Sequence, residues 1–173
     1  MWESAVYLPP FGTRLGGEEL PAITEQLLAV VPAGTKWVDH FPGRSFQQAE
    51  YLLDPVAYRA QPTWERRERS MPYRVMFGDA VFAEHATSGQ GPRWRCSTRR
   101  FLADAAQLID ELDVPRVRSE FSVGEMADLG LYKVQPGEGD DESFADVLGN
   151  LRALAEHYRT TVARGLDLII TLY

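Results

Sequence analysis

Apolar side chains recur every three or four residues in three segments of the chain, and this spacing predicts three amphipathic helices. The first covers residues 45–53, the second starts at Ser97 or Thr98, and the third and longest covers residues 143–165. Serine and threonine are favoured at helix starts and glycine just past helix ends, so these boundaries have local signals. A further helix is predicted over residues 18–31.

Shorter apolar runs without helical spacing predict strands. They cover residues 5–8, 36–41, 73–77 and 166–173, and a short extended segment covers residues 93–96. Residues 58–70 are either a helical excursion or a long surface loop. Together these elements predict an α/β fold, a single layered domain over residues 1–173 with a small mixed sheet flanked by helices.

Local capping signals predict further boundaries between residues 113 and 143. Asp113 is expected to cap a new turn, and Ser122 and Glu125 form a capping-box pattern, in which each side chain would bind the other's free amide. Gly130 is expected in the left-handed conformation that ends the turn. Residues 137–142 are predicted to form an acidic loop before a helix that starts at Ser143.

Composition places the chain among ordinary globular proteins, with 45% hydrophobic and 25% charged residues. The lone Cys96 excludes an internal disulfide and fits a reducing compartment. No basic stretch followed by an apolar core marks the amino terminus as a secretory signal, and no apolar run is long enough to span a bilayer. We therefore expect a cytoplasmic protein with no membrane partner.

Charge is distributed unevenly along a chain whose net charge is −7. Residues 59–100 contain nine arginines and four acidic residues, whereas the segments on both sides are acidic. One interpretation is that the arginines pair with acidic residues elsewhere in the fold. The other is a site for an anion. Nucleic acid is a poor candidate, because a protein with a pI of about 5.0 is repelled by a polyanion.

Aromatic residues lie among these arginines, and the two kinds of side chain together define the candidate binding site. Guanidinium groups beside aromatic rings can hold a phosphate or carboxylate while a ring stacks on an apolar body. The candidate residues are Trp64, Tyr73, Arg74, His85, Arg93, Trp94 and Arg95. The alternative is that Trp94 belongs to the core and the arginines are paired internally.

No catalytic residue, metal ligand or cofactor is predicted. Cys96 precedes a helix start, which favours a thiolate, but it matches no known nucleophile signature. The three histidines have no metal-ligand spacing, and the acidic run over residues 138–142 lacks the order of a calcium loop. A glycine-rich phosphate loop is also absent from the sequence.

Residues 44–173 resemble the YfbM-like family of bacterial proteins, a domain of unknown function. The most specific part is the order Phe121-Ser122-x-x-Glu125-Met126-x-x-x-Gly130-Leu131-Tyr132, followed by a long helix that contains Tyr158-Arg159 and an apolar terminal strand. Where the family pattern has Trp and, four residues on, His, this chain has Phe46 and Glu50. The resemblance implies an α/β fold in a bacterial cytosol and implies no reaction.

Two functions fit the sequence. The first is a non-enzymatic protein-binding or accessory module, since Trp, Tyr and Arg dominate interface hot spots. The second is a protein or enzyme that binds an anionic small molecule through the arginine and aromatic residues.

Overall fold

The computed structural model describes residues 2–8, 46–60, 63, 67–83, 94–132, 134 and 137–172. Within these ranges the side chains of residues 2–8, 82–83, 94, 169 and 171–172 are not described. The helix predicted over residues 18–31, the strand predicted over residues 36–41 and most of the segment 61–66 lie outside the described residues. All other elements expected from the sequence can be compared with the structure.

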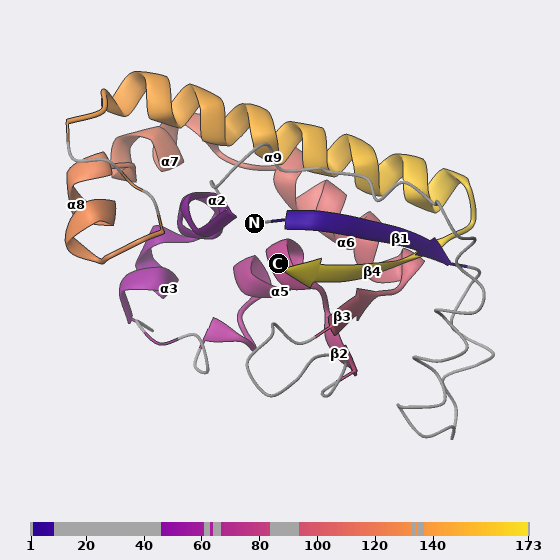
Figure 1. Cartoon of the computed structure of the whole chain (residues 1–173). Coiled ribbons are helices and arrows are strands. Elements are labelled where there is room, and N and C mark those ends of the chain that lie inside the picture. Colours follow the sequence, from indigo (N-terminus) through magenta and orange to yellow (C-terminus); the bar gives the residue numbers. More distant parts are fainter. Residues whose placement is uncertain are drawn as a thin grey trace.

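The described strands form a four-stranded sheet in the order β1-β4-β3-β2. The strands are β1 (Trp2–Leu8), β2 (Ala80–Ala83), β3 (Trp94–Ser97) and β4 (Asp167–Leu172). Every pair of described strands is antiparallel, whereas a mixed sheet was expected. The pairing of β1 with β4 joins the first strand of the chain to the last (Figure 1). Strand β4 runs opposite to both of its neighbours, β1 and β3, and β3 runs opposite to β2.

Helices cover this sheet, which confirms the α/β fold class (Figure 1). They are α2 (Phe46–Leu53), α3 (Pro55–Ala60), α5 (Met71–Phe77), α6 (Arg99–Asp110), α7 (Val114–Glu120), α8 (Val123–Asp128) and α9 (Asp140–Ala163). The longest, α9, packs along α6, and the two share a core in which Leu102, Ala105, Leu151 and Ala155 are fully buried. In the part of the chain that the structure describes, no helix is long and apolar enough to cross a membrane.

The segment Tyr73–Phe77, predicted to be a strand, is part of helix α5. Ser70 caps this helix, since its Oγ accepts a hydrogen bond from the Tyr73 amide at 3.3 Å. Pro72 lies in the first turn, where the missing amide costs little. Three consecutive buried residues, Val75 to Phe77, produced the misleading strand-like pattern. The local cap decided the structure against that pattern.

Helix α9 begins at Asp140, three residues earlier than predicted, with Gly139 as its N-cap. The predicted acidic loop was therefore wrong at its end, because Asp140, Asp141 and Glu142 form the first helical turn. Carboxylates are stabilised there by the partial positive charge of the helix start. Asp140 also accepts a hydrogen bond from the Val123 amide at 2.8 Å, which ties α9 to α8.

Candidate functional site

Arg95 is the centre of the predicted arginine and aromatic group. It projects from β3 and is buried, with 6% of its surface exposed. Its Nε donates to the Gly78 carbonyl at 3.0 Å, and its Nη1 donates to Glu68 Oε1 at 2.6 Å. The guanidinium lies over the Tyr73 ring, 5.3 Å from the centroid. The Arg95 guanidinium therefore already contacts a carboxylate, Glu68, and an aromatic ring, Tyr73, of the same chain.

Arg74, on α5, is held in a similar way. Its Nε donates to Asp79 Oδ1 at 2.8 Å, and its guanidinium lies 5.0 Å from the centroid of the Phe101 ring. The structure thus brings three of the predicted site residues together, Tyr73 and Arg74 on α5 and Arg95 on β3. Each of the two arginines has its own carboxylate partner.

The remaining predicted site residues cannot be placed. Trp64, His85 and Arg93 lie outside the described residues, and only the backbone of Trp94 is described, as part of β3. Their roles stay predictions.

A buried ion pair beside this group was missed from the sequence. Arg67 Nε donates to Glu50 Oε1 at 2.8 Å, and both side chains are almost fully buried. The Arg67 guanidinium lies over the Tyr58 ring, 4.3 Å from its centroid. Burial raises the pKa of Glu50 to about 7, against the opposing effect of Arg67. One carboxylate oxygen, Glu50 Oε2, is buried with no hydrogen-bond partner.

The sequence did contain a signal for Glu50. It lies four residues after Phe46, on the face that the apolar residues of α2 turn inwards. A charged residue on such a face is rarely buried unless it is paired, so a partner could have been sought. The identity of the partner, Arg67, could not be inferred from spacing.

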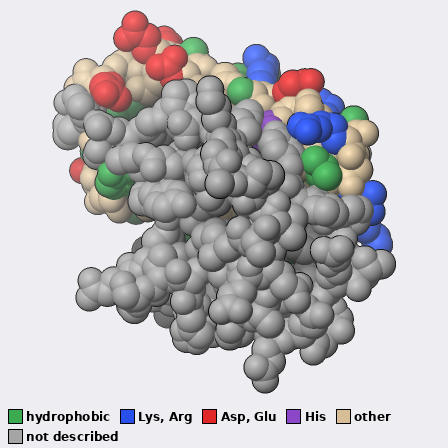
Figure 2. All heavy atoms as spheres, turned by 45° about the vertical axis from the view of Figure 1, so that its right-hand side comes forward, with side chains coloured by type: hydrophobic (Ala, Val, Ile, Leu, Met, Phe, Trp, Pro, Cys, Tyr) green, Lys and Arg blue, Asp and Glu red, His purple; other side chains and the backbone are tan. Residues whose placement is uncertain are grey.

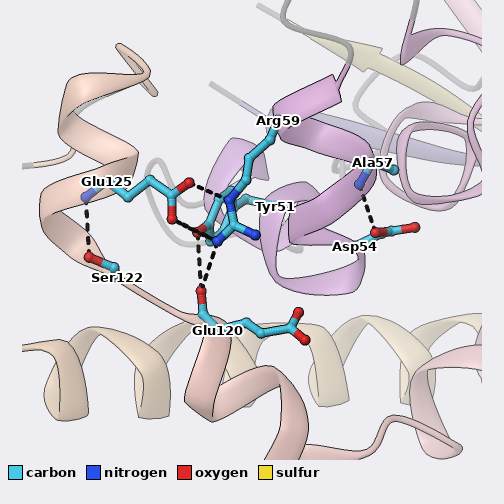
Figure 3. A network of polar contacts seen from close by, with 7 residues as sticks. All are labelled: Tyr51, Asp54, Ala57, Arg59, Glu120, Ser122 and Glu125. Carbon is cyan, nitrogen blue, oxygen red and sulfur yellow. Dashed lines mark hydrogen bonds and ion pairs between the residues drawn. The ribbon is translucent and has the colours of Figure 1, made fainter.

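Ion pairing also extends to Arg59, in the network that Figure 3 shows. Arg59 Nη2 donates to Glu125 Oε2 at 2.7 Å and to the Tyr51 hydroxyl at 3.1 Å. The Tyr51 hydroxyl donates to Glu125 Oε2 at 2.7 Å. The Arg59 hydrogen bond lowers the pKa of Glu125, so the carboxylate is firmly ionised. This network fastens α8 to α2 and α3.

The capping-box prediction is half right. Ser122 Oγ accepts a hydrogen bond from the Glu125 amide at 3.2 Å, as a capping serine should. The Glu125 carboxylate, however, points to Arg59 and Tyr51 and not back to Ser122 (Figure 3). The conspicuous glutamate of this motif therefore contributes a tertiary contact between helices.

Cys96 shows none of the features of a reactive thiol. It lies in β3 with 7% of its surface exposed. Burial raises the pKa of the thiol to about 11, and the charge of Asp79 acts in the same direction. The thiol is protonated at neutral pH and packs as a small apolar side chain.

The described residues contain no group of three His, Cys, Asp or Glu side chains that could hold a metal ion. His157 is buried within α9, with its ring near that of Tyr158. Acidic side chains gather on the surface where α9 begins, and basic ones lie towards its other end (Figure 2).

A cleft of about 330 Å³ opens where α2, α5, α6 and α7 meet. Its lining is part apolar and part charged, and consists of Leu53, Asp54, Met71, Pro72, Leu108, Glu111, Leu112, Asp113 and Arg116. Met71, Leu108 and Leu112 are only partly buried and pack against the core. The cleft therefore exposes the edge of the core to solvent between charged residues.

The described fold is an antiparallel sheet covered by helices, in which Arg67, Arg74 and Arg95 are each paired with a carboxylate. Residues 57–171 match the family described as a domain of unknown function (DUF1877), and the chain belongs to this family. A similar solved structure is the crystal structure of a protein of unknown function, YfbM from Escherichia coli.

The similarity to YfbM covers 99% of this chain and 100% of that one, with a TM-score of 0.66 and 13% sequence identity. At this identity the likeness concerns the fold alone. It confirms the YfbM-like resemblance seen in the sequence. A comparison with curated proteins finds no match.

Proposed function

We propose that this protein is a non-enzymatic module that binds a protein partner, folded as one domain over residues 1–173 and acting in the bacterial cytoplasm. The pairing of the arginines carries the proposal. Arg67, Arg74 and Arg95 each hold a carboxylate of the same chain. An anionic metabolite would have to compete with these carboxylates for the same guanidinium groups.

Two further observations support a binding role. The Cys96 thiol, with a pKa of about 11, supplies no nucleophile at neutral pH, and a single buried thiol fits a reducing compartment. The described surface offers an open cleft with apolar and charged walls, which suits recognition of another protein.

The alternative is a site for an anionic small molecule in the same arginine and aromatic group. The unpartnered oxygen of the buried Glu50 favours a polar ligand there, but one that donates a hydrogen bond and not an anion. We therefore rank this alternative second.

Native mass spectrometry of the protein, purified gently from its own host, tests the proposal. A co-purifying protein in a fixed ratio supports a binding module. A bound small-molecule mass would contradict it and favour the alternative.

Thermal unfolding with added anions is the second test. An anion that binds the folded state at a hundred times its Kd stabilises it by about 2.7 kcal/mol and raises the melting temperature. We expect no rise for the wild-type protein with pyrophosphate or citrate. A rise that persists at constant ionic strength would favour the anion site.

A further inference from the structure

We infer that the cleft between α2, α5, α6 and α7 is the docking surface, and that it receives a partner segment in which one apolar side chain is flanked by arginine or lysine. This inference rests on the proposed function and names the surface and the chemistry of the partner.

The floor of the cleft argues for an apolar side chain. Leu108, in the last turn of α6, and Leu112, two residues after its end, are partly exposed there although they pack on the core. Met71, at the start of α5, completes this floor. A volume of about 330 Å³ is at the low end of the range for ligand pockets, about 300–1,000 Å³, so the cleft suits one or two side chains.

The rim argues for a basic neighbour. Three acidic residues, Asp54, Glu111 and Asp113, line the cleft against one basic residue, Arg116. No ion pair joins any of these four to another of the described residues, in contrast to the arginines of the site described above. The three carboxylates accept hydrogen bonds from uncharged groups, the amides of Ala57 and Arg116 and the side chain of Gln107. Their charge is therefore not neutralised by an ion pair among the described residues and can attract a cation from outside.

One helix end adds to the same preference. Glu111 directly follows the last residue of α6, where the partial negative charge of a helix end favours cations. Asp54 instead lies at the start of α3, where its Oδ1 accepts a hydrogen bond from the Ala57 amide at 2.8 Å. The opposing helix starts of α5 and α7 are satisfied by their own caps, Ser70 and Asp113.

The test uses three short peptides on the isotopically labelled full-length protein, followed by two-dimensional amide NMR. The probes are acetyl-Arg-Leu-Arg-amide, acetyl-Arg-Gly-Arg-amide and acetyl-Glu-Leu-Glu-amide. We expect Arg-Leu-Arg to shift the amide signals of Leu108, Leu112 and Asp113 in a saturable way, and the other two peptides to bind more weakly or not at all.

The variant Glu111→Lys removes one acidic rim group, which accepts a hydrogen bond from the Gln107 side chain at 2.7 Å. We expect it to weaken Arg-Leu-Arg binding by roughly two- to fivefold, the range for an exposed ion pair, or more because a like charge replaces it. Asp146→Lys is the matched control, because it makes the same change in charge at an exposed position of α9 away from the cleft. Asp146→Lys should change the affinity for Arg-Leu-Arg only as much as the change in net charge does by itself.

Several results would overturn the inference. One is an equal response to the acidic peptide, and another is a response confined to signals outside the cleft. Concentration-dependent shifts of the cleft signals without peptide would mean that a second copy of the chain binds there.

The two proposals fail in different ways. A protein partner captured equally by wild type and by Glu111→Lys would leave the binding function standing and remove the cleft as its site. If the peptide binds at the cleft but native mass spectrometry finds a metabolite as the ligand and no protein partner, the result would count against the proposed function itself.

Discussion

At the scale of single residues, Glu50 is a carboxylate that the fold has removed from water. Its pKa is raised from 4.5 to about 7, chiefly by burial. The folded protein therefore holds the Glu50 proton more tightly than the unfolded chain does. The stability that this gives is fully present below pH 4.5 and is lost as the pH rises towards about 7.

The variant Glu50→Gln cannot ionise at this position and should lack that pH dependence. We expect the free energy of unfolding of the wild type, relative to Glu50→Gln, to fall between pH 4.5 and about 7. Urea unfolding at several pH values measures it. Asp146→Asn, at an exposed position, is the control and should show no such trend. A difference between wild type and Glu50→Gln that stays constant with pH would refute the expectation.

Glycines give a second prediction at the residue scale. Gly78 has φ +103°, and a Cβ there would lie 2.9 Å from the Cβ of Arg95. Gly130 has φ +70°, but nothing lies within 4 Å of an added Cβ. Gly130→Ala should therefore cost about 1 kcal/mol for the left-handed backbone, whereas Gly78→Ala should cost clearly more, on the order of 2–4 kcal/mol. Thermal or urea unfolding of the two variants decides between this order and the reverse.

At the scale of elements, the helix α8 shows how a local motif can have a tertiary role. Ser122 caps the helix, and Glu125 binds Arg59 and Tyr51 from neighbouring helices. Truncation of Ser122 to alanine should cost about 1 kcal/mol as the loss of a cap.

Double-mutant cycles separate the two roles of this motif. We expect a coupling of up to about 1 kcal/mol between Glu125→Ala and Arg59→Ala, because both groups are only partly exposed and share a bidentate contact. The coupling between Glu125→Ala and Ser122→Ala should be near zero, because Ser122 binds the backbone amide of residue 125. A strong Ser122–Glu125 coupling would mean that the reciprocal capping box forms in solution.

Element boundaries could be predicted from the sequence wherever a cap was present. Thr98, one of the two expected starts, caps α6, Asp113 caps α7 as expected, and Gly130 has the left-handed φ that was predicted. The segment Tyr73–Phe77 could not be assigned from its apolar run, because a short buried run has no distinctive period. Its own cap, Ser70, was the better signal.

At the scale of the whole molecule, Cys96 reports on the stability of the central sheet. It lies in β3, between β2 and β4, and is buried. With a pKa of about 11 and little exposed surface, the thiol should react with an alkylating reagent only when the fold opens.

We therefore expect Cys96 in the folded protein to be alkylated more slowly than a thiol in a small peptide, by a factor set by the equilibrium constant for global unfolding. The free energy of opening calculated from the labelling rate should match that from urea unfolding, measured at the same pH. A fixed small peptide thiol provides the intrinsic rate as the control. Labelling much faster than global unfolding would reveal a local opening at the β2–β3 edge of the sheet.

Charge pairing is also a property of the whole molecule. The excess of arginine in residues 59–100 suggested either a site or internal pairing, and the sequence left both open. Arg74 and Arg95 are paired with Asp79 and Glu68 of the same region, whereas Arg67 is paired with Glu50, which precedes it. Composition could locate the group but could not assign its partners.

The sequence by itself determined the helices that have caps and a 3.6-residue period, the terminal strands, and membership of the family. These features depend on interactions between residues a few positions apart, which are written directly in the order of side chains. For the same reason, Tyr73 and Arg74 could be chosen as candidate site residues from their residue types. Their spatial neighbours could not be predicted.

Only the tertiary structure decided the strand order, the partner of each arginine and the cleft. The decisive contacts join residues far apart in sequence, 17 positions for Arg67 with Glu50, 27 for Arg95 with Glu68 and 66 for Arg59 with Glu125. Which groups meet over such separations depends on how helices and strands pack together. A local pattern of side chains contains no record of that packing.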